Sequence, residues 1–164
     1  MNKSKFNLFF LFLFIINFSF ASAGDKNLIL FSKFNLSIPE NWVCKFEREN
    51  CISVSPSIDS EYSILQICHE DEFTQNFFVR LSDNEWIPNS EGYSSPIKPK
   101  IFNGVKYLKA NIYYRTSDEA GMHLNNGLIA DIIFENGAVI SFFGKGDESD
   151  FKLYENIIYS ININ

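Results

Sequence analysis

Residues 127–159 read GLIADIIFENGAVISFFGKGDESDFKLYENIIY, and this stretch carries the local signals that decide the fold. Two apolar, β-branched runs flank the dipeptide Asn136-Gly137, which tolerates the positive φ angles of a tight type I′ turn. The stretch therefore predicts a β-hairpin. Asp147 then follows as an N-cap residue, and apolar residues of helical period come after it, so a helix should pack back on the sheet. The apolar stripe of this helix consists of Phe151, Tyr154, Ile157 and Ile158.

The N-terminal segment has the organisation of a secretory signal. Two lysines precede an apolar core, and the small residues at 21–23 match the small-x-small pattern that signal peptidase cleaves. A membrane anchor is the alternative, but residues 8–20 are interrupted by an asparagine and are short for a hydrocarbon layer of ~30 Å. We expect residues 1–23 to be a cleaved signal peptide and residues 24–164 to be a single α+β domain, periplasmic or secreted.

The charge of the chain limits its partners. The formal net charge is −6 at pH 7, and removal of residues 1–23, which hold two lysines and no acidic residue, would make it −8. An acidic domain repels the phosphates of nucleic acids and of anionic membrane surfaces. We therefore expect neither nucleic acid nor membrane as a partner after cleavage, whereas a basic protein partner is compatible with the charge.

Three cysteines, Cys44, Cys51 and Cys68, lie beyond the signal segment. Export to an oxidising compartment predicts one disulfide and one remaining thiol. If strands 51–55 and 62–68 pair so that their apolar residues share a face, Cys51 lies opposite Cys68. The competing bridge, Cys44 to Cys51, would close a short turn. We favour it, because a bridge between strand ends is less strained than one inside a ladder.

Periodicity along the rest of the chain predicts an α+β fold. Alternating apolar and polar residues, or short apolar runs, indicate strands at 28–38, 42–46, 51–55, 62–68 and 105–115. Phe73, Phe77 and Leu81 are spaced by four and follow three acidic residues, so residues 70–81 are predicted to form a second helix. Together these elements predict a central antiparallel sheet flanked by helices.

Two polar segments are candidates for partner binding. Residues 82–100 are rich in proline, serine and asparagine and are predicted to be a loop, with aromatic anchors and acidic neighbours. Residues 116–126 are polar and turn-rich and are predicted to offer an acidic rim. A tryptophan tucked into the edge of the core is the alternative interpretation of Trp86. The candidate partner-binding residues are Trp86, Tyr93, Glu85, Glu91, Asp118 and Glu119.

The sequence contains no recognisable catalytic constellation. Its two histidines, His69 and His123, have no acidic partner placed by a known motif. The acidic neighbours of His69 are adjacent in sequence, whereas metal ligands usually converge from different elements. Residues 144–150 lack the spacing of a phosphate-binding loop and of a calcium loop. We expect no cofactor, no metal and no enzymatic activity.

Two short motifs point to a known group of proteins. Residues 34–42 read FNLSIPENW, and the terminal helix ends in IIYSI at 157–161. The chain resembles the PsbP-like group of exported domains, whose members start and close with similar motifs. The resemblance implies an α/β/α sandwich with a central antiparallel sheet, and it implies no catalytic residues.

Three functional hypotheses follow. The first is a non-catalytic binding protein, most concretely a periplasmic immunity protein that neutralises a secreted antibacterial toxin, because the size, export and acidity of the chain are similar to those of such proteins. The alternative is a PsbP-like envelope accessory or assembly protein. The third is a small hydrolase that uses His69 or His123.

Overall fold

The computed structural model describes residues 26–31, 34–70, 77–90, 95–102 and 104–163. Residues 1–23, the expected signal peptide, lie outside the described part. No helix among the described residues is both long enough and apolar enough to cross a membrane. The elements in chain order are β1 (Lys26–Phe31), β2 (Phe34–Pro39), β3 (Val43–Arg48), β4 (Cys51–Ser55), β5 (Ile64–Glu70), β6 (Phe78–Ser82), β7 (Glu85–Pro88), β8 (Lys100–Phe102), β9 (Val105–Asp118), β10 (Gly121–Ile133), β11 (Val139–Lys145), α1 (Glu148–Tyr159) and β12 (Asn162–Ile163).

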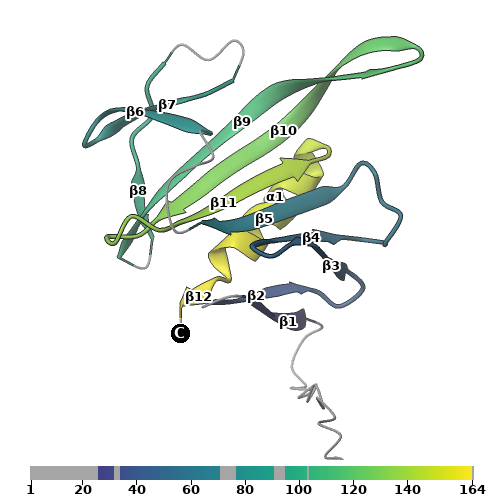
Figure 1. The fold of residues 1–164 in the computed structure, drawn as a ribbon, viewed down its shortest axis with the longest axis horizontal. Coiled ribbons are helices and arrows are strands. Elements are labelled where there is room, and N and C mark those ends of the chain that lie inside the picture. The colour runs from purple at the N-terminus through teal and green to yellow at the C-terminus, as the bar shows by residue number, and fades with distance from the viewer. Residues whose placement is uncertain (1–25, 32–33, 71–76, 91–94, 103, 164) are drawn as a thin grey trace, which may run out of the picture.

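The centre of the molecule is a seven-stranded sheet of order β3-β4-β5-β11-β10-β9-β8, and every neighbouring pair is antiparallel (Figure 1). A three-stranded sheet, β1-β2-β12, and the β6–β7 hairpin are separate from it. The described residues are therefore mostly β, with α1 as their single helix. The predicted α+β class, with helices flanking the sheet, is wrong.

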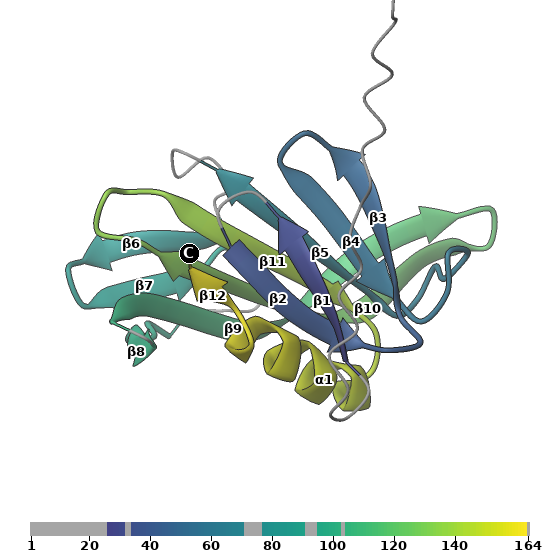
Figure 2. The ribbon, with the colours of Figure 1, turned by 90° about the horizontal axis from the view of Figure 1, so that it is seen from below.

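One face of the seven-stranded sheet is covered by α1 and by the β1-β2-β12 sheet (Figure 2). Strand β2 alternates between buried and half-buried residues, and its Leu36 and Ile38 point into this larger core. Leu128 and Ile132 of β10 and Tyr154 of α1 are fully buried in the same cluster. Burial of each such side chain stabilises the fold by about 1.5–3 kcal/mol. The larger core thus joins the seven-stranded sheet, the helix α1 and the β1-β2-β12 sheet.

The opposite face of the sheet carries a smaller core under the β6–β7 hairpin. Phe78 and Trp86 of the hairpin pack on Leu108, Ala110 and Ile129 of β9 and β10. Strand β10 therefore contributes to both cores through alternate residues, as the period of two in an extended strand requires. This makes β10 the strand on which the two halves of the interior meet.

The terminal helix is confirmed at the predicted place. All four residues of its predicted apolar stripe are buried. The N–H of Asp147 donates to Oδ2 of Asp150 at 3.0 Å, which satisfies a donor at the start of the helix. The ring of Tyr154 lies directly on Gly144, where a Cβ atom would be 2.6 Å from the ring. A glycine in β11 therefore sets how closely α1 approaches the sheet.

The hairpin predicted around Asn136-Gly137 is also confirmed. Strands β10 and β11 pair from Gly127 with Lys145 to Ile133 with Val139. The N–H of Gly137 donates to the carbonyl of Phe134 at 3.1 Å, and Gly137 has a φ of 88°. This is the pattern of a three-residue loop with glycine in the left-handed region, and not of the two-residue type I′ turn.

The second predicted helix, residues 70–81, is wrong. Glu70 ends strand β5, and Phe78–Ser82 forms strand β6. Strand β6 pairs with β7 across the turn that contains Asp83 and Asn84. The four-residue spacing of the apolar residues fits a strand as well, since even spacings also keep residues on one face of a strand. Residues 71–76 lie outside the described part.

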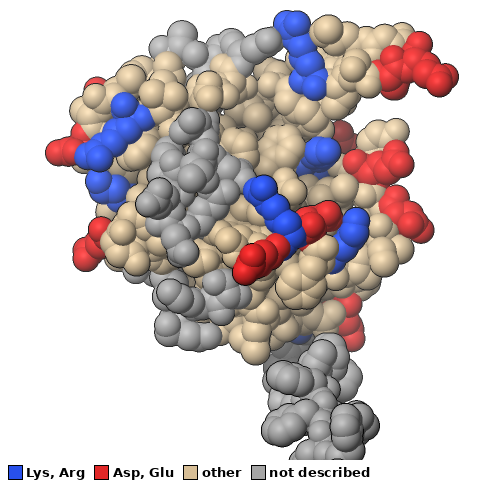
Figure 3. Space-filling model, in the orientation of Figure 1, with Lys and Arg blue, Asp and Glu red and all other residues tan. Residues whose placement is uncertain are grey.

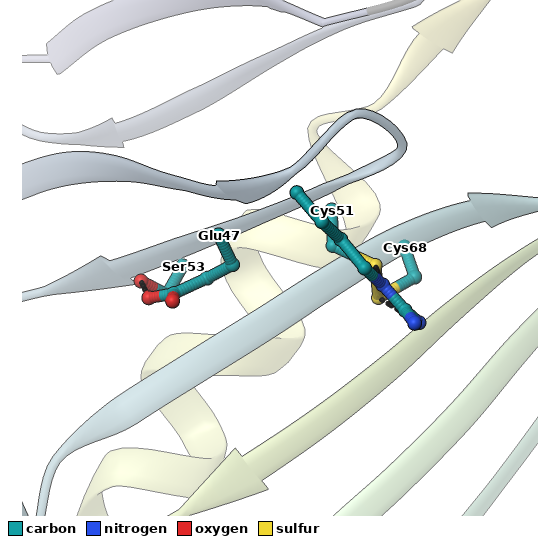
Figure 4. Close-up of a disulfide and its surroundings, with 5 residues drawn as sticks. Glu47, Cys51, Ser53 and Cys68 are labelled. Atoms are coloured by element: carbon teal, nitrogen blue, oxygen red, sulfur yellow. Dashed lines mark hydrogen bonds between the residues drawn. A yellow bond between two sulfur atoms is a disulfide. The ribbon is translucent and has the colours of Figure 1, made fainter.

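The disulfide joins Cys51 of β4 to Cys68 of β5 (Figure 4). The two residues are direct partners in the ladder, with Cα atoms 4.1 Å apart. The favoured bridge between Cys44 and Cys51 is therefore wrong, and its alternative is present. Cys44 lies opposite Val54, three positions or about 10 Å along the ladder from Cys51, at the 3.2–3.4 Å rise of a strand. Its thiol is free and partly buried.

We expect the double substitution Cys51→Ala and Cys68→Ala to lower the free energy of unfolding by about 2–4 kcal/mol, because the bridge restricts the unfolded chain. The measurement is urea denaturation of the oxidised protein without reductant. Cys44→Ala is the matched control and should keep the bridge. A loss of the disulfide in the Cys44 variant, with no effect of the double substitution, would contradict the pairing.

We also expect Trp86→Ala to destabilise the fold by about 3–5 kcal/mol, because it empties the centre of the smaller core. Trp86→Phe should recover part of this loss by filling much of the same volume. Thermal unfolding followed by circular dichroism measures both. An unchanged melting temperature in Trp86→Ala would show that the indole is not part of the core.

Candidate functional site

The most prominent feature of the seven-stranded sheet is a projecting arm, residues 113–126. Strands β9 and β10 pair without a shift from Ile133 with Lys106 to Gly121 with Asp118. Their neighbours are shorter: β11 pairs with β10 only as far as Gly127, and β8 pairs with β9 only as far as Tyr107. Beyond these points the two strands continue as a ribbon that extends from the body of the molecule (Figure 1).

One face of the arm carries three large apolar side chains that are open to solvent. Directly opposed residues of an antiparallel pair point to the same side, so Tyr113, Met122 and Leu124 share a face with their partners, which are Asn126, Ser117 and Arg115, respectively. The guanidinium of Arg115 lies 3.7 Å from the sulfur of Met122. The exposed fractions of Tyr113, Met122 and Leu124 are 58%, 68% and 65%, respectively. By alternation this is the face that α1 covers farther down the sheet, where Leu128 is buried. We call Tyr113, Met122 and Leu124 the apolar face of the arm.

The other face of the arm is polar and holds the two strands together. The side-chain amide of Asn125 donates to Oγ1 of Thr116 at 2.8 Å. Nε2 of His123 lies 3.0 Å from Oδ1 of Asp118, which also accepts the N–H of Ala120 at 2.8 Å. The hydrogen bond with His123, and then that with Ala120, lowers the pKa of Asp118. These cross-strand contacts order a ribbon that would be marginal as an isolated hairpin.

The tip and the base of the arm are acidic. Asp118 ends β9, and Glu119 follows it in the turn; both are exposed. At the base, the cation Lys145 ends β11, and after Gly146 the two carboxylates of Asp147 and Glu148 follow, so acidic groups outnumber basic ones there. In the space-filling view, acidic side chains gather along the side of the molecule from which the arm extends (Figure 3). The arm thus combines an apolar face with acidic ends.

The residues predicted for partner binding are not brought together. Asp118 and Glu119 lie at the exposed tip, although their segment is a strand pair and not the predicted polar turn. Glu85 is exposed on β7, at a distance along the fold from the arm. Tyr93 and Glu91 lie outside the described residues.

Trp86 does not act as an exposed anchor. It is only 6% exposed, and it belongs to strand β7 in a segment that the sequence predicted to be a loop. The backbone N–H of Trp86 donates to the carbonyl of Ile97 at 2.9 Å, and the guanidinium of Arg80 lies 5.8 Å from the centroid of the indole ring. The alternative interpretation, a tryptophan at the edge of the core, agrees with this position.

The exposed apolar residues of the arm were not predicted from the sequence. A usable signal was present: from Met122 to Asn125 the chain alternates between apolar and polar residues, as does a strand with one polar face. The residues after Arg115 are mostly polar, and for this reason the pattern predicts a strand that ends there. In the arm, β9 and β10 pair only with each other among the described strands, and they need no buried face. Polar residues can therefore continue a strand there, and they do not indicate where it ends.

The described residues contain no group of three or more histidine, cysteine, aspartate or glutamate side chains that could hold a metal ion. His69 lies on strand β5, where its ring packs edge-on against Phe34 with centroids 5.5 Å apart. The other histidine, His123, is part of the arm.

The fold has counterparts among solved structures. No known protein family matches the sequence, and no curated protein matches it either. The solution structure of cyanobacterial PsbP (CyanoP) from Synechocystis sp. PCC 6803 matches with a TM-score of 0.52 at 11% identity, covering 89% of this chain and 98% of that one. A crystal structure of a protein from Bacteroides thetaiotaomicron VPI-5482 matches with a TM-score of 0.53 at 11% identity over 86% of this chain.

This chain spans about half of the Bacteroides protein, 48% of its length. The match to cyanobacterial PsbP covers nearly the whole of both chains. At this level of identity the similarity concerns the fold alone. The fold of this protein is PsbP-like, as the motifs at 34–42 and 157–161 indicated.

Proposed function

We propose that this protein is an exported, non-catalytic protein-binding domain that docks a partner on the apolar face of the arm. The observation that carries the proposal is the exposure of Tyr113, Met122 and Leu124 side by side on a projecting ribbon. Adjacent apolar side chains open to solvent on a soluble domain typically mark an interaction site. The disulfide and the PsbP-like fold are compatible with export.

The three residues suit a binding hot spot. Aromatic residues and methionine are enriched at the centres of protein interfaces, and few residues supply most of the binding energy. The acidic tip would act differently, because charges at the rim of an interface mainly increase the rate of association with an oppositely charged partner. The arm therefore offers both a docking face and a means of attracting a basic protein.

The acidity favours a periplasmic immunity protein that neutralises a secreted antibacterial toxin, provided that the toxin is basic. Asp118 and Glu119 at the tip, together with the net charge of −6, motivate this form of the proposal. Co-expression with the toxins encoded beside the gene tests it. Protection by the wild type and loss of protection by an arm variant are expected; no protection against any of them excludes this form.

The PsbP-like fold favours the alternative form, an envelope accessory or assembly protein. In that case deletion of the gene should leave an envelope complex incompletely assembled, and the wild-type protein should restore it. Native gel electrophoresis of envelope extracts measures this. Identical complexes in the presence and absence of the gene exclude the accessory form.

The arm itself is tested with the partner identified by cross-linking in cells of the native host. We expect Leu124→Ser to weaken binding by roughly thirtyfold, equivalent to about 2 kcal/mol, through faster dissociation. The joint substitution Asp118→Lys and Glu119→Lys should mainly slow association. Surface plasmon resonance separates the two rates.

Ile101→Ser on β8 is the matched control. Ile101 is 70% exposed, close to the 65% of Leu124, but β8 pairs with the end of β9 that lies away from the arm. It should bind as the wild type does. Equal affinity of Leu124→Ser and the wild type, with unchanged melting temperatures, would exclude the arm as the docking surface.

A further inference from the structure

The side of β10 that faces away from β9 is an open strand edge along residues 121–126. Strand β11 occupies this side from Ile133 to Gly127 and ends there, while β10 continues to Gly121. In the described part of the chain no other strand pairs with residues 121–126 on this side. Alternate N–H and C=O groups of an open edge point outward and can bind a further strand.

This edge lacks the devices by which proteins usually protect an exposed strand. Residues 121–126, GMHLNN, contain no lysine, arginine, proline or acidic residue, and they pair with β9 without a bulge. Strand β3, at one outer edge of the same sheet, differs in both respects. It carries Lys45, Glu47 and Arg48, and its register shifts between Phe46 and Arg48. Within one molecule, therefore, the edge of β3 is protected, whereas the edge of β10 at residues 121–126 is not.

The surroundings of the open edge specify the chemistry of its occupant. A strand added in line with β11 would run between the base, where Asp147 and Glu148 follow β11, and the tip, with Asp118 and Glu119. These four carboxylates outnumber the two cations that flank the edge, Lys145 opposite Gly127 and Arg115 opposite Leu124, so the net negative charge attracts a basic segment. The same carboxylates disfavour a second copy of this chain, because its own acidic tip would approach the acidic base.

We propose that residues 121–126 of β10 bind an extended, basic segment of a partner protein as an added strand in line with β11. Main-chain hydrogen bonds to the edge hold the segment, and its alternate side chains pack on Met122 and Leu124, as in known cases of strand addition. This inference rests on the proposed function and names the class of partner and its mode of binding.

The test uses the oxidised, full exported protein and a defined probe, a short capped peptide of alternating lysine and valine. Nuclear magnetic resonance of isotope-labelled protein follows the backbone amides during titration. We expect the amides of residues 121–126 to shift with millimolar peptide or less and those of β3 to stay unchanged. A glutamate-valine peptide should cause no shift. No response to the basic peptide, or an equal response to the acidic one, overturns the proposal.

Two further measurements separate strand addition from simple attraction of charge. The same basic peptide with alternate backbone nitrogens methylated keeps its charge but loses its donors, so it should bind at least tenfold more weakly. Leu124→Lys places a lysine on this edge, as Lys45 does on β3, and should abolish binding of the basic peptide. Ile101→Lys places the same charge away from the edge and should leave binding unchanged. Equal binding of the methylated peptide and the unmethylated one overturns strand addition. The proposed function is a separate claim, and it stands if Leu124→Ser still weakens binding of the native partner.

Discussion

The uninterrupted antiparallel pairing of β9 with β10 is the constraint on which the rest of the structure depends. Because side chains alternate strictly along both strands, one register assigns Leu128 and Ile132 to the larger core and Ile129 to the smaller one. The same register continues past the ends of β8 and β11 and there sorts the arm into an apolar and a polar face. A slip of one residue would exchange the faces of both the core and the arm.

A second contact fixes the layer above the sheet. Gly144 leaves room for the ring of Tyr154, whose hydroxyl donates to the carbonyl of Lys145. This contact seats α1 beside the end of β11, so Asp147 and Glu148 lie at the base of the arm. The acidic base and the open edge thus both follow from the point at which β11 ends and the chain turns into α1. The contact between Gly144 and Tyr154 therefore determines both how the core packs and where the acidic groups lie at the base of the arm.

Local signals in the sequence predicted the parts of the fold that local physics determines. The turn at Gly137, the capping of α1 at Asp147 and the pairing of Cys51 with Cys68 as one of two alternatives all follow from short-range patterns. The β6–β7 hairpin and the arm were missed, since the burial of Trp86 and the exposure of Leu124 depend on which strands end early elsewhere in the sheet. Relative strand length is a tertiary property, and no local period encodes it.

The claim that the arm is an ordered ribbon with an open edge on β10 has a direct test in amide hydrogen exchange of the free, oxidised protein. Alternate residues of an antiparallel pair direct their N–H groups toward the partner strand and away from it. The account predicts that amides of residues 121–126 alternate between protected and rapidly exchanging, whereas those of Leu128, Ile129 and Ala130, paired on both sides, are all protected. Uniformly fast exchange along 121–126 would mean that the ribbon is not formed, and uniform protection would mean that the edge is already occupied; either result contradicts the account.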